Sequence, residues 1–287
     1  METPPLVSTR REGDVLVVTI NHPPVNALSQ PVRAGLMAAV TLLEIDASLK
    51  AMVIESVGTV FIGGADIREF GGPRLEPGLN AVCMHMDTCA KPIVVAMQGA
   101  ALGGGFEIAL AANVRVASPA AEVGFPEVLL GLLPGAGGTQ RAPRLCGAKL
   151  ALDLMLTGRR LSASAAVEVG LIDMIATDPV VAAIARAREL VVDRGALPRA
   201  RYGTALRDRG EVAAAVADAR AQIAARNDGL YSPARIVDCI EVAGTEEFDR
   251  GFAYEAHAFL DCLESPQRHE LVAKFFAERE ARKRAKG

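Results

Sequence analysis

The sequence predicts an α/β fold with mostly parallel strands, followed by a region made of helices alone. Short apolar, β-branched runs alternate with segments of helical periodicity through the first part of the 287-residue chain, and such alternation favours right-handed crossovers between parallel strands. After Arg199 the composition changes to Ala- and Arg-rich segments with one apolar face. We therefore divide the chain into a core, residues 1–200, and a helical region, residues 201–287, that serves packing or oligomerisation.

The elements of the core follow in order from the N-terminus. Ser29 offers an N-cap and Pro31 a first-turn proline, so the first helix begins there. Strands are predicted over the apolar runs at Val15–Ile20, Ala51–Ser56, Pro92–Met97 and Val114–Ala117. Further helices are predicted over Leu79–Cys89, over Gly103–Ala112 and from Gly137 to Val169, the last interrupted at Thr157-Gly158.

The helical region contributes an Ala- and Arg-rich segment, Asp208–Arg226, and two amphipathic segments, Thr245–Leu263 and Ser265–Lys286. In the last segment, one apolar stripe consists of Leu271, Val272, Phe275 and Phe276. Leaving such side chains in water costs about 1.5–3 kcal/mol each relative to burial. We therefore expect this tail to pack against the chain's own core or against a neighbouring subunit.

Composition excludes several classes of protein. With 31 Lys and Arg against 34 Asp and Glu the net charge is −3, and Trp is absent, so no nucleic-acid surface is expected. The uncharged run Pro92–Phe106 is shorter than the roughly 20 residues that a membrane span requires. The N-terminus lacks the apolar segment of a signal peptide, which predicts a cytoplasmic protein. Five cysteines without a CxxC pair indicate reduced thiols.

Several common catalytic motifs are missing from the sequence. There is no glycine-lysine pair of a P-loop, no HExxH zinc motif and no GxSxG nucleophile elbow. The segment Gly135-Ala136-Gly137-Gly138 departs from GxGxxG, because Gln140 stands where the last glycine is needed. We therefore expect no metal site and no dinucleotide site.

Two glutamates stand out by their glycine-rich surroundings. Glu107 follows three glycines in the first turn of a predicted helix, and Glu127 precedes an apolar run that leads to the glycines of 135–138. Glycines at a helix start let a backbone N–H approach a ligand, where it can stabilise a developing oxyanion. Alternatively, Glu107 merely complements the helix dipole and Glu127 is a surface carboxylate. The glycine-rich segment 61–67 supplies either a second N–H donor or a plain turn into a helix.

Three segments together resemble the crotonase, or enoyl-CoA hydratase/isomerase, superfamily. They are GGADI at 63–67, QGAALGGGFE at 98–107 and FPEVLLGLLPGAGGTQR at 125–141, in the order and spacing of that family. The resemblance covers about residues 12–200. It implies a crotonase-like spiral of ββα turns for the core, a coenzyme A thioester as substrate, and no further cofactor.

The resemblance also assigns roles to individual residues. Ala65 and Gly104 match the two N–H donors of the oxyanion hole, and Glu107 and Glu127 match the paired catalytic glutamates of the hydratases. Glu107 would deprotonate the water that attacks C3, while Glu127 exchanges a proton at C2, which requires different protonation states and one raised pKa. The residues expected to bind the substrate and its CoA are Gly64, Asp66, Ile67, Arg68 and Gly135, with Arg68 at a position where a basic side chain meets a CoA phosphate.

Two departures point to a subgroup of the family. FIGGADI at 61–67 is more similar to the hydratase part of bifunctional hydratase/3-hydroxyacyl-CoA dehydrogenases than to monofunctional hydratases. Ser265-Pro266 and Phe275–Arg279 resemble the segment that joins the two parts of those enzymes. Since the sequence contains no dehydrogenase, a separate 3-hydroxyacyl-CoA dehydrogenase is the partner that this resemblance suggests, together with a homotrimer or hexamer.

The expected activity is therefore hydration of a 2-enoyl-CoA to a 3-hydroxyacyl-CoA in fatty-acid oxidation. One alternative is a Δ3-Δ2-enoyl-CoA isomerase, which in this family can use a glutamate at the position of Glu127 alone. Another is a non-catalytic crotonase-fold module that binds a partner such as RNA. A lysine-rich helix would favour that module, and the whole chain has six lysines.

Overall fold

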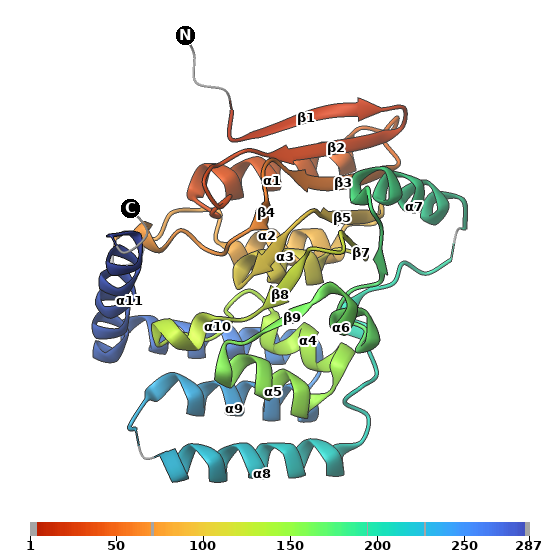
Figure 1. Cartoon of the computed structure of the whole chain (residues 1–287). Coiled ribbons are helices and arrows are strands. Elements are labelled where there is room, and N and C mark those ends of the chain that lie inside the picture. The colour runs from red at the N-terminus through yellow and green to blue at the C-terminus, as the bar shows by residue number, and fades with distance from the viewer. Residues whose placement is uncertain (1–4, 70–71, 194, 227, 285–287) are drawn as a thin grey trace.

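The computed structural model of the chain describes residues 5–69, 72–193, 195–226 and 228–284. Its larger sheet has six strands in the order β1-β2-β3-β5-β7-β10 (Figure 1). The β1–β2 pair is antiparallel and the other pairs are parallel. The strands are β1 (Val7–Glu12), β2 (Val15–Ile20), β3 (Ala51–Ser56), β5 (Ile93–Met97), β7 (Val114–Ala117) and β10 (Met174–Ile175).

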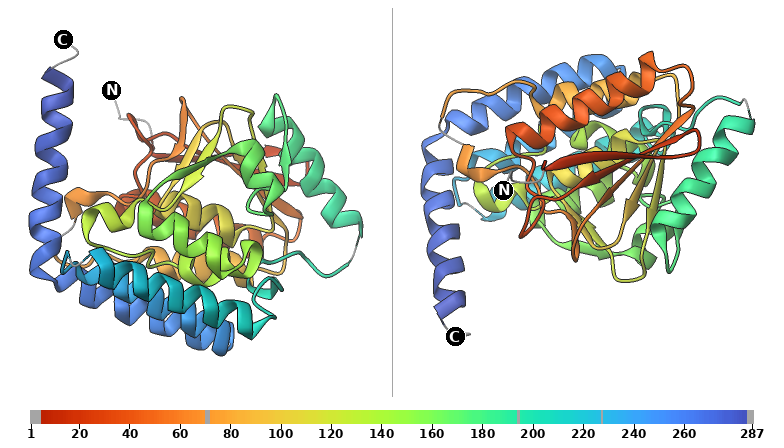
Figure 2. Two further views of the ribbon diagram at one scale, coloured as in Figure 1. Left: turned by 60° about the horizontal axis from the view of Figure 1, so that its bottom comes forward. Right: turned by 90° about the horizontal axis from the view of Figure 1, so that it is seen from above.

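Helices cover both faces of the sheet at β2, β3, β5 and β7, which explains the continuous apolar runs of these strands. On one face, Val17 and Val53 pack with Ala187 of α7 (Pro179–Asp193). On the other face, Leu16 and Ile54 belong to the main core, and the helices that contribute to it are α1 (Gln30–Ile45), α2 (Leu79–Thr88) and α3 (Gly104–Ala111). Figure 2 shows α7 on the side opposite α1.

A second sheet runs in the order β4-β6-β8-β9. Neighbours among β4, β6 and β8 are parallel, and β9 is antiparallel to β8. Each turn of the chain places one strand in the larger sheet and the next in this one, as in β3-β4-α2 and β5-β6-α3. The expected spiral of ββα turns is thus confirmed. The strands are β4 (Val60–Ile62), β6 (Ala100–Leu102), β8 (Glu122–Gly124) and β9 (Arg160–Ser162), with 3₁₀ turns at η1 (Ile67–Glu69) and η2 (Glu127–Leu130).

The remaining helices lie mostly below the sheets in Figure 1. The main core continues into them, since Leu152, Ile236 and Cys262 belong to the same apolar cluster as the strands. The last helix, α11, extends along one side of the molecule (Figure 2). The bounds are α4 (Gly138–Cys146), α5 (Ala148–Thr157), α6 (Ala163–Glu168), η3 (Ala200–Tyr202), α8 (Arg209–Arg226), α9 (Tyr231–Thr245), α10 (Phe248–Glu264) and α11 (Pro266–Arg284).

One element prediction is wrong in part. The segment from Gly137 to Val169 was expected to be helical apart from its break at Thr157-Gly158, but β9 follows that break. Gly158, at φ +68°, ends α5 in the left-handed conformation. The chain beyond it then pairs with β8, where Leu161 faces Val123. Of the predicted last helix, residues 285 and 286 lie outside the described residues.

Candidate active site

Three of the segments singled out in the sequence meet because they leave neighbouring parallel strands of the smaller sheet. β4 ends at Ile62, β6 at Leu102 and β8 at Gly124. The carboxyl ends of adjacent parallel strands lie at one edge of a sheet, where α/β proteins commonly bind ligands. Residues 63–67, 103–107 and 125–127 are therefore brought together although they are far apart in the sequence.

A pocket of about 820 Å³ opens at this edge of the sheet. The core that ends at residue 200 and the helical region after it both line this pocket. The helical region contributes Phe259 and Leu263 of α10 and Phe275 of α11. Every site residue predicted from the sequence lines the pocket, namely Gly64, Ala65, Asp66, Ile67, Arg68, Gly104, Glu107, Glu127 and Gly135.

Two residues that line the pocket, Ala65 and Gly104, bring their backbones close together. A Cβ atom placed on Gly104 would lie 3.6 Å from the amide nitrogen of Ala65. Gly104 is the first residue of α3, where an N–H has no intrahelical partner. Among the described residues, neither the Gly104 nor the Ala65 N–H has an acceptor. The pair can therefore hold a carbonyl oxygen and stabilise negative charge on it.

Glu107 projects from the first turn of α3 and is buried. Its Oε1 accepts hydrogen bonds from the N–H groups of Ala136 (2.7 Å) and Gly138 (2.8 Å). The described residues make no further hydrogen bond of normal length to this carboxyl group, and the N–H of Gly135 lies close enough to favour its ionised form. Burial raises the pKa of this carboxyl group, and the N–H donors and the Arg141 charge oppose that rise. The carboxylate therefore does more than complement the helix dipole, because the loop fixes one oxygen and leaves the other open.

Glu127 begins η2 and stands close to the entrance of α3. Gly103, at φ +53°, allows Glu127 to come this close. A Cβ atom placed on Gly103 would lie 2.9 Å from Glu127 Oε1. The residue as a whole is half-buried, yet its Oε2 is inaccessible to water and has no hydrogen-bond partner. Burial and the charge of Glu107 raise the pKa of Glu127 well above its usual range. Glu127 is thus no surface carboxylate.

The two carboxyl groups differ in what opposes their protonation. Glu107 accepts two backbone N–H bonds that favour its ionised form, whereas no side chain or N–H of another described residue donates to Glu127. One raised pKa was expected from the sequence, and the structure raises both, with Glu127 the further displaced. This arrangement suits Glu107 to accept a proton and Glu127 to donate one.

A third buried carboxyl group, Glu255 of α10, was missed by the sequence analysis. It accepts from Gly137 N (2.5 Å) and Thr139 N (2.8 Å), and burial together with the nearby Glu107 raises its pKa to about 8. A signal was present in the sequence, because Glu255 lies on the buried face of an amphipathic helix. The buried residues of that helix are Phe248, Gly251, Glu255, Ala258 and Cys262.

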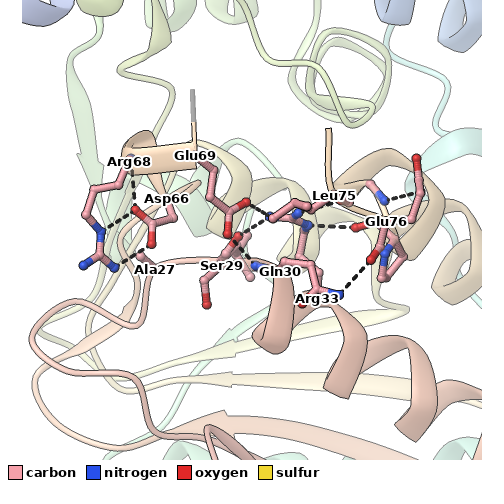
Figure 3. A network of polar contacts seen from close by, with 12 residues as sticks. Ala27, Ser29, Gln30, Arg33, Asp66, Arg68, Glu69, Leu75 and Glu76 are labelled. Atoms are coloured by element: carbon pink, nitrogen blue, oxygen red, sulfur yellow. Dashed lines mark hydrogen bonds and ion pairs between the residues drawn. The ribbon is translucent and has the colours of Figure 1, made fainter. Parts of the chain in front are cut away.

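Arg68 stands at the mouth of the pocket with its side chain 72% exposed. Asp66, which is buried, accepts from Arg68 Nε (2.9 Å) and Nη2 (2.6 Å), so the guanidinium is oriented but remains open to solvent (Figure 3). The same ion pair holds the pKa of Asp66 below its usual range. An anionic group arriving from solvent can reach this arginine.

The segment around Arg68 is tied to α1 by Arg33. Its guanidinium pairs with Glu69 (2.8 Å) and donates to the carbonyl oxygens of Leu75 (2.9 Å) and Pro77 (2.8 Å), as Figure 3 shows in part. Glu69 also accepts from the backbone N–H of Gln30 (2.7 Å). These bonds fix the wall of the pocket that follows Ala65.

The tail that begins at Ser265 was expected to pack against the chain's own core or against a neighbouring subunit. In the structure, α11 contacts the chain's own core. A Cβ atom placed on Gly131, just after η2, would lie 3.0 Å from Leu271 Cδ1 of α11. Phe275 lines the pocket, and the side chain of Phe276 lies outside the described set.

Three further features concern metals, cysteines and membranes. The described part of the chain contains no group of three or more His, Cys, Asp or Glu side chains arranged to hold a metal ion. The five cysteines are free thiols, four of them buried. Within the same residues, none of the helices combines the length and apolar character that crossing a membrane requires.

Comparisons with known proteins agree with this geometry. The sequence model of the family "Enoyl-CoA hydratase/isomerase" matches residues 10–201. The chain is 37% identical to the human peroxisomal bifunctional enzyme, over 96% of this chain and 38% of the relative, and 33% identical to the fatty acid oxidation complex subunit alpha of Shewanella halifaxensis, over 96% and 41%. Among solved structures, carnitinyl-CoA hydratase from Mycobacterium avium superposes with a TM-score of 0.71 at 28% identity, over 96% of this chain and 97% of the other.

Proposed function

The chain belongs to the enoyl-CoA hydratase/isomerase family, and on that premise we propose that it adds water across the 2,3 double bond of an acyl-CoA thioester to give a 3-hydroxyacyl-CoA. One observation carries the proposal. Two carboxyl groups with different hydrogen-bond partners, Glu107 and Glu127, line the same pocket as two acceptor-free N–H groups.

The N–H groups of Ala65 and Gly104 bind the thioester oxygen. They stabilise the enolate that forms there when electrons leave the double bond, which is worth more in the transition state than in the bound substrate. The open Oε2 of Glu107 accepts a proton from water as the water oxygen bonds to C3. Glu127 gives its proton to C2, and proton exchange with solvent then restores both side chains.

The rest of the substrate is assigned to the two ends of the pocket. Arg68 meets a CoA phosphate, with Asp66 orienting it, and the neighbouring Gly64, Ile67 and Gly135 contact the thioester portion. The acyl chain lies against apolar side chains, which include Leu79, Leu130, Leu133, Phe259, Leu260 and Leu263. CoA is part of the substrate, and this mechanism invokes no further cofactor.

The names of the relatives support a role in fatty-acid oxidation. The chain spans about two fifths of the length of the curated relatives it matches, which include a peroxisomal bifunctional enzyme and a fatty acid oxidation complex subunit. A 3-hydroxyacyl-CoA dehydrogenase, which would oxidise the product, is accordingly the proposed partner. Because both peroxisomal and bacterial proteins are among the relatives, the cytoplasmic location stays a prediction, as does the homotrimer or hexamer.

The test is to incubate the purified protein with 2-enoyl-CoA and 3-enoyl-CoA thioesters and to identify the products. We expect 3-hydroxyacyl-CoA from the 2-enoyl substrates. Formation of 2-enoyl-CoA from 3-enoyl substrates, without hydration of either, would replace hydratase by isomerase as the function. The variant Glu107→Gln separates the two activities, since it removes the base for water and keeps Glu127 for proton transfer.

A further inference from the structure

One loop connects the buried carboxyl groups of α3 and α10. The N–H groups of its four successive residues, 136–139, point alternately at the two side chains. The acceptors are Glu107 Oε1 for Ala136 N (2.7 Å) and Gly138 N (2.8 Å), and Glu255 for Gly137 N (2.5 Å) and Thr139 N (2.8 Å).

The loop has little freedom to reorient between these two side chains. Gly137 has φ +101°, and a Cβ atom placed on it would lie 1.8 Å from Arg141 Nη1, so the tight turn requires glycine. That same Nη1 donates to the carbonyl oxygen of Ala136 (2.8 Å). Both polar groups of the Ala136 peptide backbone are therefore held, its oxygen by Arg141 and its N–H by Glu107.

We propose that Glu255 is a positioning residue for Glu107. By accepting the N–H groups of Gly137 and Thr139, it turns the alternate N–H groups of the loop toward Glu107 Oε1. Glu107 then keeps its Oε2 free for the attacking water. The kinetic consequence rests on the proposed hydratase function, but the effect on the Glu107 carboxyl group does not.

Thr139 extends the network on the side away from Glu107. Its hydroxyl donates to Glu255 Oε2 (2.5 Å) and accepts from Gln140 Nε2 (3.0 Å), which also donates to the carbonyl oxygen of Cys239 (3.2 Å). Three donors therefore converge on Glu255, and both of its oxygens are used. A side chain with a single acceptor oxygen cannot satisfy all three.

The charge state of Glu255 simplifies the test. Its side chain is fully buried, which together with the nearby Glu107 raises its pKa to about 8, whereas the three donors favour its ionised form. Loss of a negative charge in Glu255→Gln would lower the pKa of Glu107, so a rise in that pKa reports the lost hydrogen bonds. The charged and titratable groups that face Glu255 are Glu107 on α3, Glu127 on η2, Arg141 on α4, Cys83 on α2 and Cys239 on α9.

The decisive variant is Glu255→Gln, which keeps the volume but turns an NH₂ group toward one of the loop N–H donors. The matched control is Cys262→Ala. Cys262 lies two turns further along the same buried face of α10 and does not line the pocket. The control loses packing in the same helix without touching residues 136–139.

The readout is the pKa of the Glu107 carboxyl group. It is measured from the ¹³C chemical shift of the carboxyl carbon as pH changes, on protein with labelled glutamate. The variant Glu107→Gln assigns the signal. In Glu255→Gln we expect this pKa to rise by about one unit. A shift of that size corresponds to the loss of about one hydrogen bond to the ionised carboxyl group. We also expect kcat for a 2-enoyl-CoA to fall about tenfold or more with KM little changed. Cys262→Ala should leave both quantities at the wild-type values.

An unchanged Glu107 titration together with wild-type kcat in folded Glu255→Gln overturns the proposal, as does an equal shift in Cys262→Ala. If the Gln variant does not fold, Glu255→Asp is measured instead and judged by the same criteria. This variant keeps the carboxyl group but shortens the side chain by one methylene, so it weakens the bonds to the loop. A wild-type protein that hydrates no enoyl-CoA, but shows the shift on substitution, refutes the proposed function and leaves the positioning role standing.

Discussion

The two walls of the pocket are held in opposite ways. The wall that follows Ala65 depends on ion pairs with one partner closer to solvent, since Arg68 is 72% and Glu69 24% exposed while Asp66 and Arg33 are buried. The wall at 134–139 depends on side chains withdrawn from water, since Glu255 and Arg141 are fully buried. Exposed ion pairs contribute little and are screened by salt, whereas a buried charge that loses its partner is costly. Changes in the first wall should alter CoA binding, and changes in the second should alter stability and rate.

The largest effect is expected at the two carboxyl groups between the walls. Glu107→Gln and Glu127→Gln should each lower hydration at least about a hundredfold, because positioned acids and bases typically contribute 10²–10⁴-fold. Turnover is measured with a 2-enoyl-CoA, and binding of a saturated acyl-CoA serves as the control for an intact pocket. Near-full activity of Glu127→Gln would refute its role as the acid.

The same pair predicts a bell-shaped dependence of kcat/KM on pH. Glu107 must be ionised, so the rate falls as pH drops through its raised pKa; Glu127 must be protonated, so the rate falls again as pH rises through its higher pKa. Glu107→Gln removes the acidic limb and Glu127→Gln the basic limb from any residual activity. A single limb in the wild type would contradict two titrating groups.

The second wall predicts a large loss of stability when Arg141 is replaced. Arg141 pairs with buried Asp87 (3.1 Å) and lies over the rings of Phe248 and Phe252 of α10. Arg141→Ala should lower the free energy of unfolding by about 3–5 kcal/mol, because it leaves the buried Asp87 with only a longer ion pair to Arg201 (3.6 Å) and removes the cation from the two rings. Urea unfolding measures this loss.

The matched control for that prediction is an exposed pair. Arg159 and Asp153 are each 44% exposed, and replacing Arg159 by Ala should cost no more than about 1 kcal/mol. Equal losses in Arg141→Ala and Arg159→Ala would remove the distinction between buried and exposed ion pairs.

Much of the fold could be predicted because burial on both faces of a sheet leaves a local trace. The run VLVVTI predicts β2 with its observed bounds. β1 was missed because its VSTRRE sequence is polar and largely exposed, and it is held by backbone pairing with β2. The three-residue strand β4 lies in a glycine-rich turn and has no periodicity of its own. The amphipathic α7 was overlooked although its pattern was present.

The site shows the same division between local and distant signals. Glu107 and Glu127 could be singled out because glycines stand beside them in the chain. Glu255 has no such context, since the N–H groups that it accepts belong to residues 137 and 139 on another element. Its partnership forms only when α10 folds against the beginning of α4. A single sequence carries no local pattern for a contact of that range.

A smaller effect is expected from Gly104→Ala at the junction of the two walls. The added methyl group would meet Leu79 Cδ2 at 2.6 Å, next to the Ala65 amide nitrogen. Leu79 is flexible and lines the pocket, so it can move, but it then crowds the space for the thioester oxygen. Turnover should fall more than affinity for a saturated acyl-CoA, because the N–H groups act mainly on the developing oxyanion.

The double variant Gly104→Ala/Leu79→Ala sharpens that result. It removes the side chain that the new methyl group displaces, and part of the lost turnover should return. Equal turnover with weaker binding in Gly104→Ala would instead assign Gly104 a packing role. Kinetics and calorimetric binding on the same preparations distinguish the two.

The smallest effect is expected at Arg68 in the first wall. Arg68→Ala should raise KM for a CoA thioester severalfold at low salt, because the substrate phosphate loses its cation, while kcat stays close to the wild type. The effect is modest because the guanidinium of Arg68 is exposed, and salt screens exposed charges. The rise should shrink as salt is added. The matching pantetheine thioester, which lacks the nucleotide phosphates, should show no change in KM.

Arg186→Ala, in an exposed pair on α7 far from the pocket, is the control. A KM that rises equally for both thioesters would mean that Arg68 supports the loop around Asp66 instead of binding phosphate.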